Sequence, residues 1–497
     1  MNKTDNFGFK HKSGILMPVS SLPSKYGIGD FGKEAYKFVD FLKECRQKCW
    51  QVLPLVQTSY GDSPYQSPAS ASLNPYFIDP DTLVLKKLLT KEEAKALADT
   101  SPRVDYGRLF FTRYEALRVA FSRFSPDNTY RSFLKREASW VKDYALFMAL
   151  KVKNSYRPWY EWEESERDFE KAKAKADLLR DECDFWLWVQ YEADAEWRAL
   201  KAYAKKNGII LIGDMPIYVA HDSLDVWSSP EDFLLDEGFN PRFVAGCPPD
   251  AYAEEGQLWG NPIYDWDKMK NDGFSWWLDR VGRSFRLYDI LRIDHFRGFA
   301  SYWQIPYGDE NAMRGSWIAA PGKELFAAVR ASYPKARIIA EDLGFITDDV
   351  RELLAYTGFP GMKLLQFAFF SPDSEYLPKN YTTENCVVYT GSHDSECTKS
   401  WASALKGDEK KLFLSETKKQ KGEAKTDALI RLAMQSSGNL TVIPIQDYLG
   451  LTNAEGRMNT PSVAMGNWTF RVSQRYMTKN LKKKILLFTA ESKRMAK

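Results

Sequence analysis

Short apolar runs rich in β-branched residues recur at eight places along the chain. Each run is long enough for a buried strand, and amphipathic helical patterns at 32–47, 276–285 and 322–331 lie between several of them. Strands and helices that alternate in this way are typical of a (β/α)₈ barrel, whose parallel strands are buried on both faces. The sequence therefore predicts an α/β protein with a (β/α)₈ TIM barrel, whose strands are expected at 14–19, 50–56, 209–214, 289–294, 337–341, 362–369, 386–390 and 440–445.

The interval from residue 81 to residue 208 is too long for one barrel helix. It contains a capping box at Thr90-Lys-Glu-Glu93 and a row of large side chains at 110, 114, 117, 121 and 124 that follows one helical face. A further helical pattern at 185–206 ends at Asn207-Gly208, a common C-terminal stop. We therefore predict a helical insertion at 81–183, after the second strand, followed by the barrel helix that leads into the third strand.

A second long interval, 218–288, is rich in Pro, Gly, Asp and Trp and shows little periodicity. Irregular stretches of this length in a compact protein are usually functional lids or binding loops. We predict a loop-rich insertion here that includes a flap over the functional site. The chain after Tyr448 is too short for a separate C-terminal β-sandwich domain, so residues 1–497 are expected to form one barrel with these inserted subdomains.

Composition and charge narrow the class of protein. The 497 residues are 44% hydrophobic and 27% charged, which fits a soluble globular chain. The 69 Lys and Arg nearly balance the 66 Asp and Glu and form no long basic run, so nucleic acid is not an expected partner. The charged N-terminal segment does not look like a signal peptide, and no run of ~18 apolar residues occurs. We expect no membrane association and a cytoplasmic location.

Cysteines and histidines carry no metal signature. The six cysteines are scattered without a Cys-x-x-Cys pair, and no two of the four histidines are close enough in sequence for a helical zinc pair. We therefore expect reduced thiols and no metal. Aromatic residues make up 14% of the chain, and many stand in Gly- and Pro-rich loops, which weakly indicates a sugar or another flat ligand.

Four of the predicted strands end in a carboxylic acid. Asp214, Asp294, Glu341 and Asp394 follow the third, fourth, fifth and seventh strands, and the chemistry of such barrels takes place where the strands end. A single acid there is ordinary, because Asp often caps a helix or begins a turn. Four acids at one barrel mouth repel one another, a cost that function explains better than folding. A protonated acid paired with a carboxylate is what cleavage of a glycosidic bond requires.

Arg292 stands two residues before Asp294, so both side chains point to the same side of the fourth strand. The guanidinium is expected to lower the pKa of Asp294 and keep it ionised as a nucleophile, while Glu341 has a raised pKa and holds a proton. Retaining enzymes place such a pair ~5–5.5 Å apart, so we expect that separation, with Asp394 at the same mouth. The alternative is a purely structural Arg–Asp pair.

The strand ends belong to longer motifs that are spread over nearly the whole chain. These are 20–30 (SSLPSKYGIGD), 61–67 (GDSPYQS), 213–218 (GDMPIY), 248–250 (PPD), 256–262 (GQLWGNP), 292–298 (RIDHFRG), 340–344 (AEDLG), 391–394 (GSHD) and 466–468 (GNW). Each motif alone is weak evidence for a protein family, whereas the whole set is specific to one. By this set the chain resembles the amylomaltases, or 4-α-glucanotransferases, which are relatives of the α-amylases.

The resemblance implies a role for particular residues. Asp294 matches the nucleophile, Glu341 the general acid/base and Asp394 the carboxylate that stabilises the transition state. Other matching positions imply contacts with the sugars, Trp259 from the flap and Asn467 on the acceptor side; they are Tyr65, Asp214, Trp259, Arg292, His295, His393 and Asn467. For the two aromatic residues, packing is the alternative interpretation. After Asp394 the chain departs from the family pattern, with Ser395-Glu396-Cys397 where Asn-Asp-Thr is usual.

The resemblance implies a retaining transferase that moves a segment of an α-1,4-glucan to the 4-OH of another sugar. Its partners would be α-1,4-glucans and maltooligosaccharides, this chemistry requires no cofactor or metal, and the oligomeric state is not predicted. An α-1,4-glucan hydrolase of the α-amylase type is the main alternative, because its first half-reaction is the same. An inactive glucan-binding scaffold is another, which the complete set of acids disfavours. The long flap at 244–262 favours transfer, because excluding water while admitting a sugar requires a lid.

Overall fold

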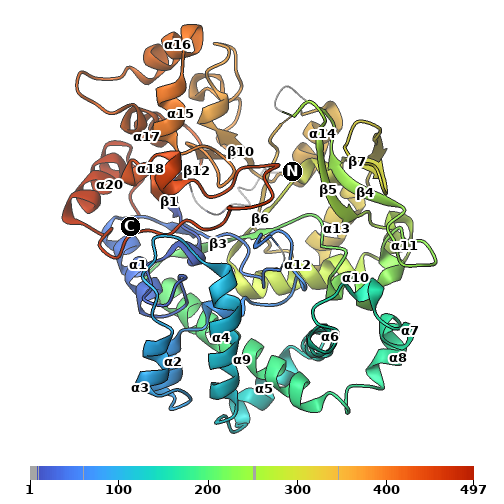
Figure 1. Ribbon diagram of the computed structural model, residues 1–497. Coiled ribbons are helices and arrows are strands. Elements are labelled where there is room, and N and C mark those ends of the chain that lie inside the picture. The colour runs from blue at the N-terminus through green and yellow to red at the C-terminus, as the bar shows by residue number, and fades with distance from the viewer. Residues whose placement is uncertain (1–7, 9, 60, 250–252, 345, 497) are drawn as a thin grey trace.

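Eight parallel strands form a barrel near the centre of the molecule (Figure 1), in a computed structural model that describes residues 8, 10–59, 61–249, 253–344 and 346–496. The two edge strands of this sheet also approach each other. The amide of Ala340, in one edge strand, donates a 3.0 Å hydrogen bond to the carbonyl of Pro360, the residue directly before the other edge strand, so the ring of strands nearly closes. The eight predicted strands are confirmed. In spatial order they are β10 (Gly361–Leu364), β11 (Cys386–Tyr389), β12 (Leu440–Pro444), β1 (Lys12–Leu16), β2 (Cys49–Gln51), β3 (Ile210–Met215), β6 (Ile290–Ile293) and β9 (Ile338–Ala340).

α-Helices connect most of the barrel strands, and three of them stand where the sequence shows helical patterns. The connection from β10 to β11, which is described throughout, departs from the regular alternation, because it contains only two short 3₁₀-helices, η6 (Leu365–Phe367) and η7 (Pro378–Asn380). The connecting helices of the other units are α1 (Lys33–Glu44), α12 (Ser275–Leu287), α13 (Gly322–Ser332), α14 (Asp348–Thr357), α15 (Thr398–Ala404), α16 (Gly407–Thr417) and α17 (Lys425–Gln435).

The described residues between β2 and β3 are mainly helical and lie below the barrel in Figure 1. The predicted capping box is confirmed, since the side chain of Thr90 accepts from the amide of Glu93 and the Glu93 carboxylate accepts from the amide of Thr90. Gly208 has a φ of +77°, the left-handed conformation expected just after the long helix that leads into β3. The domain boundaries 81–183 stay a prediction. The helices are α2 (Pro80–Leu85), α3 (Lys91–Ala96), α4 (Tyr106–Phe121), α5 (Asn128–Arg136), α6 (Val141–Lys153), α7 (Glu164–Arg167), α8 (Phe169–Lys173) and α9 (Arg180–Lys206).

A second, antiparallel sheet in the order β5-β4-β7-β8 carries the flap region. The interval 218–288 looks loop-rich in the sequence, which does not predict β4 or β5. Gly246 and Gly260 interrupt their patterns, and the partner strand β7 comes from beyond Asp294, so no local signal marks the sheet. Residues 250–252 of the expected flap lie outside the described residues. The elements here are α10 (Leu224–Ser228), β4 (Phe243–Cys247), β5 (Gln257–Pro262), α11 (Trp266–Asn271), β7 (Ser301–Pro306) and β8 (Ser316–Ala319).

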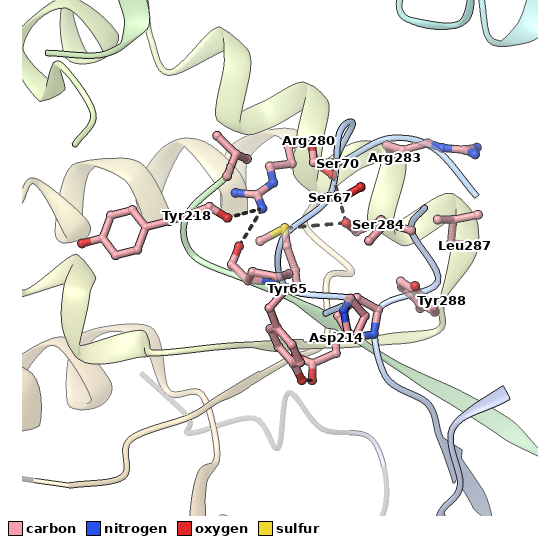
Figure 2. Close-up of a pocket in the computed structure, with 16 residues that line it drawn as sticks. Tyr65, Ser67, Ser70, Asp214, Tyr218, Arg280, Arg283, Ser284, Leu287 and Tyr288 are labelled. Atoms are coloured by element: carbon pink, nitrogen blue, oxygen red, sulfur yellow. Dashed lines mark hydrogen bonds between the residues drawn. The ribbon is translucent and has the colours of Figure 1, made fainter. Parts of the chain in front are cut away.

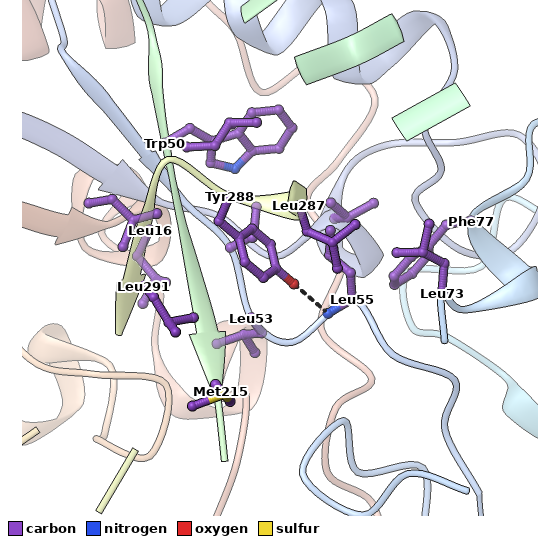
Figure 3. Packing of buried hydrophobic residues seen from close by; sticks show 14 of the residues in the cluster. Leu16, Trp50, Leu53, Leu55, Leu73, Phe77, Met215, Leu287, Tyr288 and Leu291 are labelled. Carbon is purple, nitrogen blue, oxygen red and sulfur yellow. Dashed lines mark hydrogen bonds between the residues drawn. The ribbon is translucent and has the colours of Figure 1, made fainter. Parts of the chain in front are cut away.

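Gly213, directly before Asp214, has no room for a side chain. The ring of Tyr288 lies against Gly213, where a Cβ atom would come within 2.1 Å of the ring carbons. The Tyr288 hydroxyl accepts a hydrogen bond from the amide of Leu55 at 3.3 Å, and fully buried side chains such as Trp50 pack nearby (Figure 3). This apolar cluster supports the carboxyl ends of β2 and β3 next to the acid.

The chain after β12 forms three helices and a long loop between the second and the third, and its end packs back on the barrel. Arg494 is fully buried and donates to the carbonyls of Lys12, Met434 and Ser436, which ties the end of the chain to β1. No helix in the described part of the chain is both long enough and apolar enough to cross a membrane. The predicted fold class, an α/β TIM barrel, is confirmed, and the described residues after β12 contain no further strand. The last helices are α18 (Ile445–Leu449), α19 (Asn453–Gly456) and α20 (Lys479–Glu491).

Candidate active site

The carboxyl ends of β3, β6 and β9 bring three of the predicted acids together. Asp214 in β3 is the register partner of Arg292 in β6. The amide of Glu341, just after β9, donates a 3.0 Å hydrogen bond to the carbonyl of Ile293 in β6, so the pairing of strands extends to the positions where the acids stand. Because neighbouring strands are ~4.8 Å apart, Asp214, Asp294 and Glu341 share one barrel mouth.

The guanidinium of Arg292 connects these three acids. Arg292 is buried, with 3% of the residue exposed, and its Nη1 donates to both carboxylate oxygens of Asp214 at 2.6 and 2.7 Å. Nη2 lies 3.0 Å from Oδ1 of Asp294 and 3.9 Å from Oε2 of Glu341. These two oxygens can therefore be no farther apart than the sum of the two distances. That limit is below ~9 Å but overlaps the lower end of the ~6.5–9.5 Å range of inverting enzymes, so the expected ~5–5.5 Å of a retaining enzyme stays a prediction.

Asp294 and Glu341 both have raised pKa values, to different extents. Burial raises the pKa of Asp294 to about 6, although Arg292 acts to lower it. Burial also raises the pKa of Glu341 to about 8, against the same guanidinium and with the help of the Asp294 charge. The expected rise for Glu341 is confirmed, and the expected lowering for Asp294 is wrong. Loss of hydration outweighs the ion pair, because Arg292 makes its shortest hydrogen bonds to Asp214.

Backbone amides hold the carboxyl group of Glu341. The amide of His295 donates to Oε2 at 2.6 Å, and the amide of Leu343 donates to Oε1 at 3.2 Å. His295 adopts a left-handed backbone conformation with a φ of +48°, which is unfavourable for a residue with a side chain. Such local strain is typical of functional sites, and here it accompanies the short bond from the His295 amide to the acid.

The strand β5 reaches the mouth through Trp259. Its ring stands edge-on to His295, with centroids 4.8 Å apart and planes at 89°, and its Nε1 donates to Oε1 of Gln257 at 3.1 Å. Burial, with Arg297 nearby, lowers the pKa of His295 to about 3, so its imidazole is neutral at physiological pH. An indole beside a neutral imidazole suits a sugar, which presents apolar faces and hydroxyl edges.

Another group of predicted residues gathers around Asp394. The hydroxyl of Tyr65 donates to Oδ2 of Asp214 at 2.7 Å, and its ring stacks on His393 with centroids 5.1 Å apart. Nε2 of His393 lies 3.2 Å from Oδ2 of Asp394. Burial opposes both charges, yet this pair lowers the pKa of Asp394 to about 2 and raises the pKa of His393. Asp394 is therefore ionised at any pH at which the protein would work.

Asn459 and Arg457 are site residues that the sequence analysis misses. Nδ2 of Asn459 donates to Oδ1 of Asp394 at 2.6 Å. Arg457 donates to the backbone carbonyl of Asp394 at 3.2 Å and to that of Asn459 at 2.8 Å. Both residues stand in a loop after α19, at no strand end and in none of the recognised motifs. A lone Asn in a loop has no local signal that would point to this role.

The segment that departs from the family pattern is held by hydrogen bonds of its own. Oγ of Ser395 accepts from the amide of Ser392 at 2.9 Å, directly before His393. Oε1 of Glu396 accepts from Nδ2 of Asn453 at 3.2 Å. Ser395 and Glu396 therefore both contribute hydrogen bonds that hold the turn next to Asp394.

Asn467 has a loop-building role. Its Oδ1 accepts from the amide of Thr460 at 2.9 Å, and its Nδ2 donates to the carbonyl of Val463 at 2.7 Å. These bonds shape the loop 460–467, which follows Asn459, the partner of Asp394. The structure does not bring the Asn467 amide to the acids by any hydrogen bond in the described part of the chain, so its contact with an acceptor stays a prediction.

Tyr65 and Asp214 line a pocket between β3, α12 and the loop 54–70 that follows β2 (Figure 2). Arg280 from α12 lines it and donates to the carbonyls of Pro216, Ile217 and Tyr218 at 2.7, 2.9 and 3.4 Å. This one guanidinium therefore holds the segment that leads from Asp214 toward the flap.

The arrangement at the barrel mouth suits one kind of chemistry. It presents Asp294 and Glu341, whose pKa values burial raises, with Asp394, whose pKa is lowered, and a wall of aromatic rings nearby. A carboxylate and a carboxylic acid at short separation can break a glycosidic bond with retention of configuration. Fold and site together define a barrel enzyme that acts on glycosidic bonds.

Similarity to known proteins identifies the family within this class of enzymes. A family model described as 4-alpha-glucanotransferase matches residues 17–478. The 4-alpha-glucanotransferase of Clostridium butyricum is 45% identical over 482 residues, covering 95% of this chain and 99% of that protein, and the one of Thermus thermophilus is 42% identical over 478 residues, covering 92% and 94%. The amylomaltase from Streptococcus agalactiae in complex with acarbose has a TM-score of 0.95 and 39% identity, covering 98% of this chain and 100% of that one. The chain belongs to the 4-alpha-glucanotransferase family and is an enzyme of glycosyl transfer.

Proposed function

We propose that the protein transfers segments of α-1,4-glucans by a retaining double displacement. Asp294 is the nucleophile, Glu341 the general acid and base, and Asp394 the carboxylate that stabilises the charged sugar. The observation that carries the proposal is the contact of one Arg292 nitrogen with both acids, at 3.0 Å to Asp294 and at 3.9 Å to Glu341. The reverse assignment needs an ionised Glu341 beside a protonated Asp294, which the shorter distance from Arg292 to Asp294 disfavours.

In the first half-reaction, a carboxylate oxygen of Asp294 attacks the anomeric carbon of the donor sugar as the bond to the glycosidic oxygen breaks. The proton of Glu341 passes to that oxygen, and the leaving glucan departs with a free 4-OH. Asp394, held by His393 and Asn459, faces the positive charge that develops on the ring. The product is a covalent glycosyl ester of Asp294.

In the second half-reaction, the 4-OH of an acceptor sugar gives its proton to Glu341, which now acts as a base. The acceptor oxygen attacks the anomeric carbon, the ester bond to Asp294 breaks, and the configuration is retained. One α-1,4 bond has been broken and one formed, and Glu341 again carries a proton. Metal or organic cofactors take no part in these steps.

The substrates proposed are starch-like glucans and maltooligosaccharides, with glucose or another glucan as acceptor. Sugar contacts are assigned to Tyr65, Asp214, Arg292, His295, His393, Trp259 and, on the acceptor side, Asn467. Support comes from the related amylomaltase, which was solved with acarbose. A cytoplasmic location is proposed from the composition, and no two of the described cysteines form a disulfide, as reducing conditions require.

Incubation with maltotriose as sole substrate tests transfer against hydrolysis. Transfer yields free glucose together with products longer than maltotriose, whereas hydrolysis yields glucose and maltose alone. Asp294→Asn at the same protein concentration is the control and should yield neither. Wild-type products no longer than maltotriose would favour the hydrolase, and no products at all would favour a glucan-binding scaffold.

A further inference from the structure

A reciprocal pair of side-chain amides joins two segments that approach the site from different parts of the chain. Nε2 of Gln66 donates to Oδ1 of Asn261 at 3.1 Å, and Nδ2 of Asn261 donates back to Oε1 of Gln66 at 3.3 Å. Asn261 is 5% exposed, and its Nδ2 also donates to the carbonyl of Val219 at 2.8 Å. This contact is called the Gln66–Asn261 pair below.

Each partner of the pair stands next to an aromatic residue of the site. Gln66 directly follows Tyr65, whose hydroxyl bonds to Asp214 and whose ring stacks on that of His393. Asn261 lies two residues after Trp259 in β5. The pair is therefore a direct link between the two segments that carry these aromatic rings.

The strand that carries Trp259 is poorly fixed by its own backbone. Gly260, between Trp259 and Asn261, has a φ of +75°, which interrupts the extended conformation. The register between β4 and β5 also shifts between Val244 and Gly246, so residues 259–261 stand opposite an irregular part of the ladder. Side-chain hydrogen bonds must then contribute to the position of Trp259, and the Gln66–Asn261 pair is adjacent to it.

We propose that the Gln66–Asn261 pair is a positioning device that sets the spacing between Tyr65 and Trp259 and thereby the partition of the glycosyl-enzyme between an acceptor sugar and water. This inference rests on the proposed function. Asp294, Glu341 and Arg292 are held by the barrel strands and do not hydrogen-bond to the pair, so formation of the glycosyl-enzyme should proceed without it. In the second half-reaction a sugar must be held against competition from water, and a displaced Trp259 would weaken that hold.

Gln66→Leu tests the proposal, because leucine has a similar size and cannot form hydrogen bonds, while Asn261 keeps its bond to Val219. The ratio of transfer to hydrolysis on maltotriose should fall at least about five- to tenfold, because one neutral hydrogen bond is worth about that factor and the change removes two. The KM for glucose as acceptor should rise. The rate of the first half-reaction, measured with α-maltosyl fluoride, should change less than about twofold.

A matched control is Gln474→Leu, which removes the hydrogen bond from Nε2 of Gln474 to the carbonyl of Ser24 at 2.9 Å. It should leave the ratio of transfer to hydrolysis unchanged.

A double variant tests whether the two residues act as a pair. The variant that carries both Gln66→Leu and Asn261→Leu should have the same ratio as Asn261→Leu alone, because Asn261→Leu already breaks the pair. If Gln66→Leu does not fold, Gln66→Glu replaces it. The glutamate can still accept from Asn261 and cannot donate to it, so an intermediate shift is expected.

An unchanged ratio in a folded Gln66 variant, with only a lower melting temperature, would show that the pair is merely structural and would overturn the proposal. Fully additive effects of the Gln66→Leu and Asn261→Leu changes would also contradict it. Failure of the wild-type protein to form products longer than maltotriose would instead refute the proposed function. The two failures are therefore distinguishable in one set of reactions.

Discussion

The barrel mouth and the antiparallel sheet that carries the flap meet at the site, and they are held in place differently. In the mouth, the acids stand at the ends of neighbouring parallel strands, and backbone bonds such as that from Glu341 to Ile293 fix their spacing. In the flap, Trp259 stands in an irregular stretch of β5 and depends on side-chain contacts. Changes in the mouth should therefore disable both half-reactions, whereas changes in the flap should redirect the glycosyl-enzyme.

The largest effect is expected from Asp294→Asn in the mouth. The amide has the shape of the carboxylate and cannot form the glycosyl ester, so kcat/KM for maltotriose should fall by at least ~10⁴-fold. Measured initial rates at equal folded concentration check this. A variant within tenfold of the wild type would mean that the nucleophile is another group.

Glu341→Gln should reduce kcat/KM by ~10²- to 10⁴-fold and change its pH dependence. Activity requires an ionised Asp294 and a protonated Glu341, so the wild type should lose activity as the pH falls below about 6 and as it rises above about 8. The variant should lose the limb at high pH and keep the limb at low pH. A basic limb that persists in Glu341→Gln would assign the acid to another residue.

The same variant should gain stability relative to the wild type as the pH rises. The pKa of Glu341 is higher in the folded state than in the unfolded state, so the wild-type protein loses stability as the pH rises from about 4.5 to about 8, while glutamine does not titrate. The stability of the variant relative to the wild type should be at least ~1 kcal/mol greater at pH 8 than at pH 4. Thermal unfolding of both proteins at the two pH values measures this change. The same difference in melting temperature at both pH values would contradict the raised pKa.

Asn459→Ala should act on the mouth through Asp394. The variant removes a hydrogen bond to a carboxylate, which is worth ~1.5–3 kcal/mol, so kcat/KM should fall by ~10- to 100-fold while the transfer-to-hydrolysis ratio changes little. The pKa of Asp394 should rise, because that bond helps to lower it. Steady-state kinetics with product analysis check the expectation. A changed ratio with unchanged kcat/KM would place Asn459 in acceptor binding instead.

Trp259→Ala should have the smallest effect on the first half-reaction. It should act mainly on the partition of the glycosyl-enzyme between an acceptor sugar and water. Loss of an aromatic face costs ~1 kcal/mol, so the ratio of transfer to hydrolysis should fall several-fold while glycosyl-enzyme formation slows less. Product analysis on maltotriose checks this, with Trp317→Ala as a control on β8, a strand of the same sheet. A lower stability with an unchanged ratio would show that Trp259 is a packing residue.

The mouth could be anticipated from the sequence because its geometry follows from local patterns. The buried runs are confirmed as barrel strands, and acids at the ends of such strands must converge, which places Asp214, Asp294 and Glu341 correctly. The direction of the Asp294 pKa could not be anticipated. It depends on how fully the group is removed from water and on the partner that Arg292 favours, and neither has a sequence signal.

The antiparallel sheet that carries the flap could not be anticipated in the same way. This sheet combines β4 and β5 with β7 and β8, which are separated from them in sequence by the barrel strand β6 and Asp294. Glycines break the alternation within the short strands, and contacts such as Gln66 with Asn261 span 195 residues. Asn459 is missed for a related reason, since its hydrogen bond to Asp394 depends on the path of the loop after α19.

The central claim, covalent catalysis by Asp294, is tested most directly by trapping the intermediate. Glu341→Gln incubated with α-maltosyl fluoride should accumulate a glycosyl-enzyme, because the fluoride leaves without a proton and the base for the second step is missing. Mass spectrometry of a proteolytic digest should find one maltosyl group on the peptide that contains Asp294. A maltosyl group on another residue, or fluoride release with inversion of configuration and no adduct, would contradict the account.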